Sequence, residues 1–540
     1  MSRILTPLTP VLYLALLIAG ALLPRAKAAA HSLHAAQATC TTVKQAYKDA
    51  ECCGAEDKDT RKVDLGIYRP GCKSVVAQTA TSGPIVGGTL YVYDPSSDSK
   101  AWKTINGKNY VDLAEISIAA GCVPKHKPHM VLPSPDGKHT AITYTGDQDF
   151  VVLKNDEYKA LFCPTVDFLK DGGVFGGATH SGAWFGSESF LLLDMTGCVN
   201  GACGGGVYRF DFSFDTQGIM TSYQFHSALG VDGLKAARST SATKPIALGN
   251  NPMGDYKHLF FVSDAKGAGS IMDASTMTWV KHFAKSEFGD CPSGGLWIEP
   301  HPSDPAIVMT QYGTQGVDDK IGKNCLFKVN MADLTLTLFA PLADNTDAHG
   351  LQFCQTSGGD LTVMNTNRQT STLDVIKYAT GEFLLQGYDL NAKAFDSIQA
   401  KLSLDPSLPE VEGKPATPLQ QGQTKKLQPD VVYLNNGVLY LAARGPKPVS
   451  AVKAQNAYEN AHPGVMALKI DPATCVPTDD QTDAFALTTL ERSPAITSDV
   501  HGAWGVMNGN NMEIWAVDQA GTGSVQSYHV YSACPAVGAS

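Results

Sequence analysis

The sequence predicts an all-β chain that folds as a seven-bladed β-propeller behind an N-terminal disulfide-rich segment. One unit of strand, turn and strand recurs along the chain, and self-similarity at a roughly fixed spacing is typical of repeat architectures. The 51 Gly and 30 Pro among 540 residues suit a protein with many turns. Apolar helical periodicity over about 12 residues is nearly absent from the recurring units. Seven units of short strands close most naturally into a propeller.

The repeat is clearest where Thr346-Asp-Ala-His-Gly350 returns as Ser498-Asp-Val-His-Gly502. Lys127-Pro-His-Met130 and Ala178-Thr-His-Ser-Gly182 are weaker relatives, and each copy precedes an apolar strand, a turn and a second strand. The opening strands of the seven units are expected near His129, His180, Ile246, Gly294, His349, Asp430 and His501. Four strands with their turns need about 40–50 residues. The longer intervals therefore require loop insertions, which we expect at Leu404–Lys426 and Val449–His462.

Residues 1–30 have the features of a secretory signal peptide. Arg3 supplies a positive charge, Val11–Leu23 is almost wholly apolar, and Ala26–Ala30 offers small residues for cleavage. An uncleaved membrane anchor is the alternative, but the apolar run is short for a span. The chain is therefore expected to be secreted, to the extracellular space or the periplasm. It has no later apolar run long enough for a membrane helix, so no membrane association is expected once the signal is removed.

The cysteines indicate an oxidising compartment. Thirteen cysteines in an exported chain imply disulfides, and the odd number implies at least one unpaired thiol. Cys40, Cys52, Cys53 and Cys72 lie within residues 31–80, ahead of the repeats. A zinc knuckle would use wider-spaced CxxC pairs. We therefore expect residues 31–80 to form a disulfide-stapled cap and residues 81–540 to form the propeller.

Closure of the ring explains a strand pair that precedes the first unit, at Pro84–Trp102. Its most strand-like part, Gly88–Tyr93, is expected to complete the last blade, because propellers must protect the edges between their first and last blades. A rival all-β architecture, two stacked sandwich domains, does not explain the recurring unit that begins with His.

Composition excludes two classes of protein. Hydrophobic content of 43% and charged content of 17% describe a globular chain rather than a disordered one. The net charge is −10, and the chain has no long basic run, so nucleic acid is not an expected partner.

One unit resembles a known superfamily. Lys127–Asp147 contains a Pro-His pair, a Ser-Pro-Asp-Gly turn and a following strand, and in this it is similar to a blade of the YVTN-type propellers. Thr366–Ile376 resembles the second half of such a blade. The superfamily includes lactonases and redox enzymes, so the resemblance implies the architecture better than the activity. In copper propellers such as nitrous oxide reductase, His from the inner strands holds the metal. The dense motif that would assign this chain to that group is missing.

The candidate site follows from the propeller geometry. Residues at equivalent blade starts converge on one mouth of the central channel, and His129, His180, His349, His501 and Asp430 occupy five of these seven starts. In blade order they form an unbroken arc. Imidazoles that converge with a carboxylate suit copper, zinc or iron. Gly350 and Gly502 leave room for close approach by a ligand or a backbone, and Asp347 and Asp499 are positioned either to orient a ligating ring or to enter the channel themselves.

A structural role is the alternative for these histidines, either as polar lining of a wet channel or as ties between neighbouring blades. Trp184 and Trp504, three or four residues after a channel His, are expected in the core.

The sequence therefore favours a secreted metal-dependent enzyme, foremost an oxidoreductase that acts on a small-molecule substrate at the His cluster. In that function His129, His180 and His501 are the first-choice ligands. An extracellular propeller that binds a protein or glycan through its long inserts is the second reading. A lactonase-like calcium hydrolase is the third, although calcium prefers oxygen ligands to imidazole.

Overall fold

A computed structural model describes the chain in segments. They are residues 73–78, 88–120, 127–145, 149–162, 173–174, 179–195, 198–199, 202–230, 244–265, 269–291, 295, 297–312, 323–344, 346–390, 428–444, 464–478, 485–488, 499–518 and 528–533. The chain divides into two compact units, one of residues 84–164 and 168–525, the other of residues 1–83, 165–167 and 526–540. The described part of the second unit is one antiparallel pair, β1 (Lys73–Gln78) with β33 (Tyr528–Ala533).

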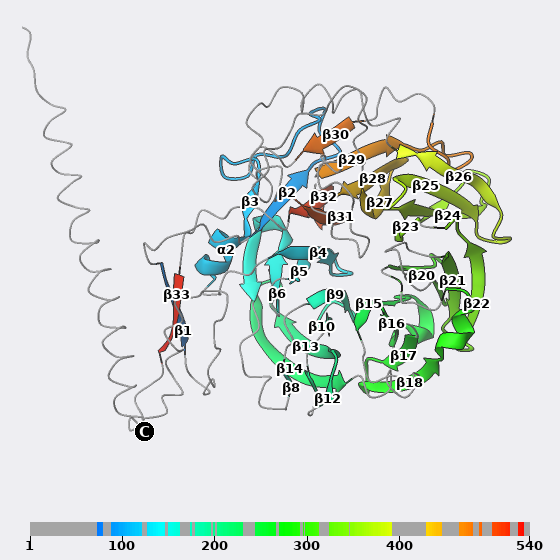
Figure 1. The fold of residues 1–540 in the computed structure, drawn as a ribbon. Coiled ribbons are helices and arrows are strands. Elements are labelled where there is room, and N and C mark those ends of the chain that lie inside the picture. The colour runs from blue at the N-terminus through cyan, green and yellow to red at the C-terminus, as the bar shows by residue number, and fades with distance from the viewer. Residues whose placement is uncertain are drawn as a thin grey trace, which may run out of the picture. The chain divides into compact units, whose positions relative to one another are not determined.

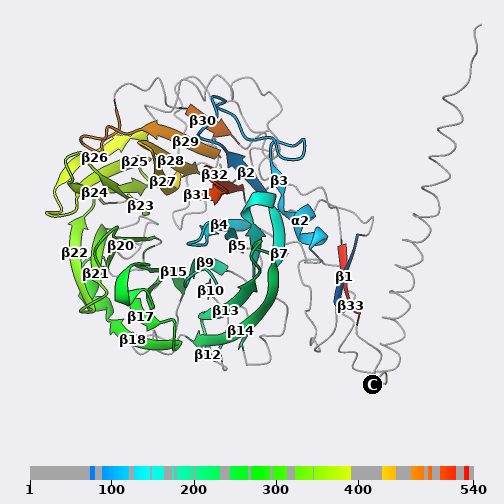
Figure 2. The same cartoon turned by 180° about the vertical axis from the view of Figure 1, so that it is seen from behind.

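The larger unit is the predicted seven-bladed propeller. It contains seven four-stranded antiparallel sheets, which are arranged around a common centre with their first strands innermost (Figures 1 and 2). The innermost strands of blades 1 to 7 are β4 (Pro128–Pro133), β9 (Thr179–Trp184), β15 (Pro245–Asn250), β19 (Ile298–Pro300), β23 (Ala348–Gln355), β27 (Pro429–Asn435) and β31 (Val500–Asn508).

The outer strands complete each blade. Blade 1 adds β5 (His139–Tyr144), β6 (Asp149–Lys154) and β7 (Lys159–Phe162); blade 2 adds β10 (Ser189–Asp194), β13 (Gly206–Phe214) and β14 (Met220–Gly230); blade 3 adds β16 (Leu259–Asp264), β17 (Gly269–Asp273) and β18 (Thr278–Phe283). Blade 4 adds β20 (Ala306–Tyr312), β21 (Asn324–Asn330) and β22 (Thr335–Pro341); blade 5 adds β24 (Leu361–Asn367), β25 (Thr372–Lys377) and β26 (Phe383–Asp389); blade 6 adds β28 (Val438–Ala443), β29 (Gly464–Lys469) and β30 (Phe485–Thr488).

Blade 7 closes the ring with strands from both ends of the propeller sequence. β32 (Asn511–Asp518) pairs with β31 on one side and with β2 (Thr89–Tyr93) on the other, where Leu90 faces Val517. The predicted closure by Gly88–Tyr93 is confirmed. The position of its partner was predicted wrongly: β3 (Val111–Asp112) rather than a strand before Trp102 forms the outer edge. Sequence reasoning also missed the short helix α2 (Leu113–Ala119) that follows β3.

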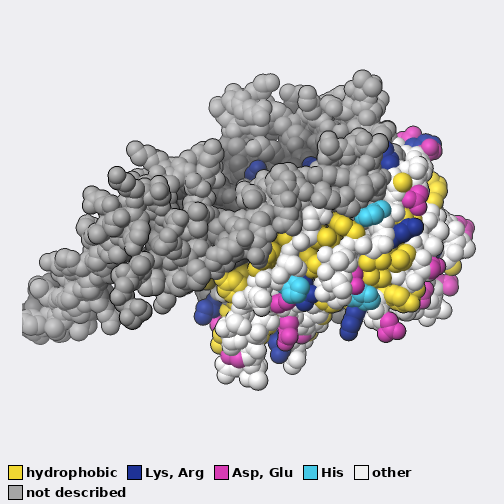
Figure 3. All heavy atoms as spheres, turned by 90° about the horizontal axis from the view of Figure 1, so that it is seen from below, with side chains coloured by type: hydrophobic (Ala, Val, Ile, Leu, Met, Phe, Trp, Pro, Cys, Tyr) yellow, Lys and Arg dark blue, Asp and Glu magenta, His cyan; other side chains and the backbone are white. Residues whose placement is uncertain are grey.

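The core lies between neighbouring blades. Between blades 7 and 1, for example, Leu90, Val131, Ile142 and Trp515 pack in one buried cluster. Exposure increases from the inside of each blade outward. Second strands such as β10 and β16 are fully buried, whereas the outermost strands β18, β22 and β26 consist mainly of exposed and half-buried residues. Hydrophobic side chains therefore reach the surface, where they lie among polar and charged ones on the face drawn in Figure 3.

Minor elements lie within the blades and between them. They are the 3-10 turns η1 (Asn155–Glu157), η3 (Gly254–Tyr256) and η4 (Lys285–Phe288) and a small sheet of β8 (Gly173–Val174), β11 (Cys198–Val199) and β12 (Ala202–Cys203).

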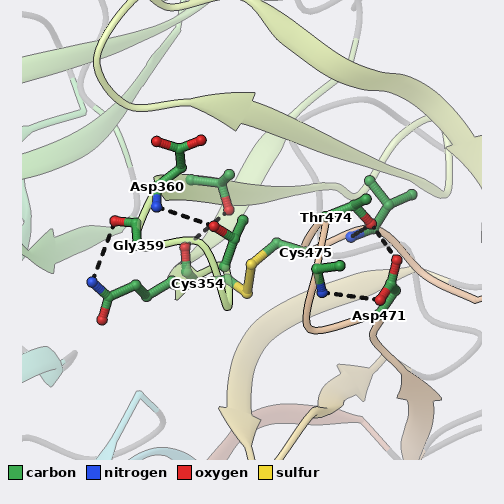
Figure 4. The surroundings of a disulfide bond; sticks show 11 residues. Cys354, Gly359, Asp360, Asp471, Thr474 and Cys475 are labelled. Atoms are coloured by element: carbon green, nitrogen blue, oxygen red, sulfur yellow. Dashed lines mark hydrogen bonds between the residues drawn. A yellow bond between two sulfur atoms is a disulfide. The ribbon is translucent and has the colours of Figure 1, made fainter.

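Two disulfides staple the part of the propeller that the structure describes, and the sequence could pair neither of them. Cys291 bonds Cys325 of blade 4, and Cys354 of blade 5 bonds Cys475, which follows the third strand of blade 6. Figure 4 shows the second bridge between a turn near Asp360 and a turn near Asp471. No cysteine is free among those whose side chains are described.

Several expectations fall outside the described residues. They are the signal peptide, the cap cysteines Cys40, Cys52, Cys53 and Cys72, and the inserts Leu404–Lys426 and Val449–His462. Among the helices within the described ranges, none has the length and apolar character to cross a membrane.

Candidate functional site

The innermost strands share one irregularity, and it carries the predicted site residues. In six of the seven blades, the pairing between the first and second strands shifts register close to the beginning of the first strand. The residues passed over at these shifts include His129, His180, Ile246, His349, Asp430 and His501. A bulge bends its strand and redirects a side chain. The repeated bulge therefore explains how equivalent positions present their side chains to one centre.

The glycines after two of the histidines make the bulges fit together. A Cβ on Gly502 would lie 2.6 Å from the backbone oxygen of His129, and one on Gly350 would lie 2.4 Å from that of Asp430. Thr366 bridges the same seam, since its hydroxyl donates to the Asp430 carbonyl at 2.9 Å and accepts from the Gly350 N–H at 3.0 Å. The expected close approach of a backbone is thus observed.

The five predicted residues lie in one contiguous arc, in the predicted blade order. The His129 ring centroid lies 4.2 Å from that of His180 and 4.5 Å from that of His501. His501 Nδ1 lies 3.4 Å from Asp430 Oδ2, and His349 Nε2 lies 3.7 Å from Asp430 Oδ1. Asp430 is therefore placed between two imidazoles from blades 5 and 7. On blades 3 and 4 the corresponding described residues, Ile246 and Gly295, have no titratable side chain, and the predicted start Gly294 lies outside the described residues.

The two aspartates of the repeat contact the histidines that follow them. Asp347 Oδ1 lies 3.2 Å from His349 Nδ1, and Asp499 Oδ2 lies 3.2 Å from His501 Nε2. Each aspartate is thus in position to orient its own imidazole.

Sequence reasoning missed two arginines that hold these aspartates. Arg444 donates two hydrogen bonds to Asp499, at 3.0 and 2.9 Å, and Arg368 donates to Asp347 at 2.8 Å. Each arginine follows the second strand of its blade, at the end of β28 and β24. Their other nitrogens lie 3.6 and 3.7 Å from Asp430 Oδ2. The only signal in the sequence was that an arginine directly follows the second strand in both blades.

Burial and charge set the protonation of the cluster. Burial lowers the pKa of His180 to about 3, and neighbouring His501 adds to this. Burial also lowers the pKa of His129 and His501, with a further contribution from nearby cationic groups. Burial disfavours the charged form of Asp430, but the neighbouring imidazoles and guanidiniums outweigh it and lower its pKa. The pKa values of Asp347 and Asp499 are likewise low despite burial, mainly because of their arginines.

Two buried atoms of the arc have no hydrogen-bond partner among the described residues, His180 Nδ1 and Asp430 Oδ2. Such atoms in a folded protein need an explanation, for example an ion or a water. His129 differs, because its Nδ1 hydrogen-bonds the His180 carbonyl at 2.9 Å. That bond leaves its Nε2 as the lone-pair nitrogen. Within the described ranges, no group of three or more His, Cys, Asp or Glu is arranged so that it could hold a metal ion. Ligation by these residues stays a prediction.

No protein-family model matches the chain, and no curated protein is similar to it in sequence. Solved structures with a similar fold include the hydrazine synthase of Kuenenia stuttgartiensis, with TM-score 0.37 and 11% identity over 68% of this chain and 80% of that one. A streptogramin B lyase has TM-score 0.41 and 10% identity, covering 83% and 99% of the two chains. U3-55K has TM-score 0.39 and 7% identity, covering 73% and 95%. Similarity at this level says nothing about activity, and the strand pairing itself establishes the architecture.

Proposed function

We propose that this chain is a secreted, metal-dependent propeller enzyme whose metal is held by Asp430 together with His349 and His501. His129 and His180 continue the arc and would supply a further ligand or contact the substrate. The function we favour is that of an oxidoreductase for a small molecule.

The spacing around Asp430 carries the proposal. Its carboxylate lies 3.4 and 3.7 Å from nitrogens of His501 and His349, which is longer than an N–H···O hydrogen bond of about 2.7–3.2 Å. Two ligand atoms about 2.0–2.2 Å from a tetrahedral metal lie about 3.3–3.6 Å apart. The pairs on both sides of Asp430 are therefore spaced nearly as neighbouring ligands of one ion. Small side-chain rotations would bring a third ligand into range.

The charge of the cluster also favours a bound cation. The three described carboxylates and the two guanidiniums of the cluster sum to −3 + 2 = −1. Asp347 and Asp499 each form a close ion pair with one arginine. Asp430 has no such close pair, since the nearest nitrogens of Arg368 and Arg444 lie 3.6 and 3.7 Å from its Oδ2. A buried carboxylate without close pairing is costly. A divalent or transition metal ion would offset that cost.

The other residues of the cluster prepare the site. Asp347 and Asp499 hold their imidazoles from behind, and such outer carboxylates fix ring orientation and raise ligand basicity. Lowered histidine pKa values keep the rings of His180 and His501 neutral at pH 7, which ligation requires. Imidazole with carboxylate suits copper, zinc or iron, and a copper or iron ion would supply redox chemistry. The side of the ring formed by blades 3 and 4 would admit the substrate.

Elemental analysis tests the proposal. Protein purified without chelators should contain about one copper, iron or zinc per chain, and Asp430→Asn should lower occupancy about 10-fold or more. Asp374→Asn is the matched control, since Asp374 is also buried but its carboxylate accepts hydrogen bonds from the Asn367 amide and the Gly387 N–H. Circular dichroism would establish that both variants fold. A wild-type protein that neither contains nor takes up these metals overturns the proposal, and calcium alone would favour a hydrolase.

Secretion is tested separately. The described disulfides are compatible with an oxidising compartment. Mass spectrometry of the protein from its native host should find a mature N-terminus near residue 31. An intact Met1 would contradict a cleaved signal.

A further inference from the structure

A second layer of channel residues lies beyond the histidine–aspartate arc. Three residues after His349, Asp430 and His501, the same strands carry Gln352, Tyr433 and Trp504. Three residues of extended strand span about 10 Å. The two layers are thus separate sites, and the second contains no described histidine.

Aromatic rings meet inside the channel in this layer. The Trp297 ring, from the segment that enters blade 4, lies 5.4 Å from that of Trp504 on blade 7. Tyr433 of blade 6 lies 5.2 Å from the same Trp504 ring. Blades 4 and 7 are not neighbours, so the contact between the two tryptophans must cross the central channel. All three rings are only half-buried. Part of the Trp504 ring therefore faces the channel, while the side chain also packs against the buried cluster between blades 7 and 1, as expected of a core residue.

Glu299 lies beneath these rings, with only 5% of its surface exposed. Its carboxyl accepts hydrogen bonds from Trp297 Nε1 at 3.1 Å and from Gln352 Nε2 at 3.0 Å. No described lysine, arginine or histidine forms an ion pair with it, in contrast to the three aspartates of the first layer. Burial raises the pKa of Glu299 to about 8. Glu299 also affects a neighbouring titratable group. The pKa of Tyr433 is raised mainly by burial and further by the charge of the Glu299 carboxylate.

We propose that Trp297, Tyr433, Trp504 and Glu299 form a binding site for an organic ammonium cation. Aromatic faces attract cations within about 6 Å of the ring, and more strongly when water is excluded. A buried carboxylate at the base of those rings supplies the opposite charge. Among the described residues no positively charged side chain is paired with Glu299, so a cationic ligand would supply the missing positive charge.

The hydrogen bonds argue against a carbohydrate, the other ligand that stacks on aromatic rings. Gln352 uses its amide nitrogen on Glu299 and accepts from the Leu434 N–H at 3.3 Å with its oxygen. Glu299 uses both oxygens as well. The layer therefore offers few free polar atoms to a polyol. This inference goes beyond the proposed function and does not depend on a metal in the first layer.

Binding should release a proton. A cation favours the ionised carboxylate, so a Glu299 that is protonated before binding must lose its proton as the ligand enters. Affinity should then rise by close to tenfold from about pH 6 to 7 and by about fivefold from pH 7 to 8.

Titration calorimetry with choline tests this on full-length, chelator-treated protein. Choline should bind more than about tenfold tighter than its neutral carbon isostere dimethylbutanol, and titrations in two buffers at pH 7 should report close to one proton released. Glu299→Gln should abolish the proton release and the preference for the cation. Glu382→Gln, at an exposed carboxylate, should change neither.

Three outcomes would overturn the proposal. They are equal affinity for choline and dimethylbutanol, no choline binding up to about 10 mM, and proton release that persists in Glu299→Gln. The comparison of the two ligands needs only wild-type protein, so it holds even where a variant misfolds. Because the protein is treated with a chelator, a failure of choline binding leaves the metal proposal intact. Absence of a metal in the first layer would likewise leave the choline site untouched.

Discussion

Replacing Glu299 by Gln should change the pH dependence of stability more than any other single substitution in the second layer. The folded protein raises the pKa of this carboxyl from 4.5 to about 8. Above pH 4.5 the unfolded chain gains stability by ionising, whereas the folded chain keeps the proton. The contribution of Glu299 to stability is therefore full below pH 4.5 and is lost progressively as the pH rises toward 8.

The size of this effect follows from the shift. Each pH unit between the two pKa values lowers the free energy of unfolding by about 1.4 kcal/mol. Between about pH 5.5 and 7.5 the wild type should lose about 2.5 kcal/mol relative to Glu299→Gln, which has no proton to bind. The amide keeps the shape of the side chain, so the comparison isolates the charge.

Urea unfolding followed by tryptophan fluorescence at the two pH values measures the difference. Glu382→Gln serves as the control, because its carboxylate is 63% exposed beside Lys377 and should follow the wild type. Saturating choline should flatten the wild-type profile if the second-layer site binds it. Parallel pH profiles for the wild type and Glu299→Gln, within about 0.5 kcal/mol, would refute the reasoning.

Three further predictions concern the ring itself. Gly502→Ala places a Cβ 2.6 Å from a carbonyl oxygen of blade 1 and should lower the free energy of unfolding by about 1–3 kcal/mol, whereas Gly358→Ala, with nothing closer than 3.7 Å, should leave the melting temperature unchanged. Replacing Cys354 and Cys475 together by Ser removes a link that spans 121 residues and should lower the urea midpoint by the equivalent of about 2–5 kcal/mol; an unchanged midpoint would contradict its role as a staple. Deleting Gly88–Tyr93 should expose the edge of β32 and cause aggregation visible by light scattering, and a monomeric deletion variant with the original melting temperature would show that blade 7 does not need this strand.

The fold could be predicted well because it depends on local repetition. The His-Gly unit, the short strands and the turns recur in sequence, and recurrence alone locates the seven inner strands. Closure by Gly88–Tyr93 followed from the need to cover an edge. The outer partner strand could not be located, because β3 is only two residues long and carries no pattern.

The site could be predicted only where the repeat extends into it. Equivalent blade starts placed the five arc residues correctly relative to one another. Arg444 follows the second strand of blade 6 and reaches Asp499 of blade 7, whereas Arg368 follows the second strand of blade 5 and bonds Asp347 of the same blade. The two spacings differ, so no sequence pattern links the arginines to their aspartates. The disulfides join positions 34 and 121 residues apart, which the sequence cannot pair. Trp504 packs against the core as expected, but its contact with Trp297 could not be predicted, because that contact joins two blades that are far apart in sequence.

The central claim is that Asp430 and its two flanking imidazoles hold a metal. Anomalous diffraction at the absorption edge of the metal found by elemental analysis tests it most directly. We expect one strong peak about 2.0–2.2 Å from Asp430, His349 and His501. A map without a peak at this position, or with its peak among the N-terminal cysteines, would contradict the claim and leave the arc as a structural network of ion pairs.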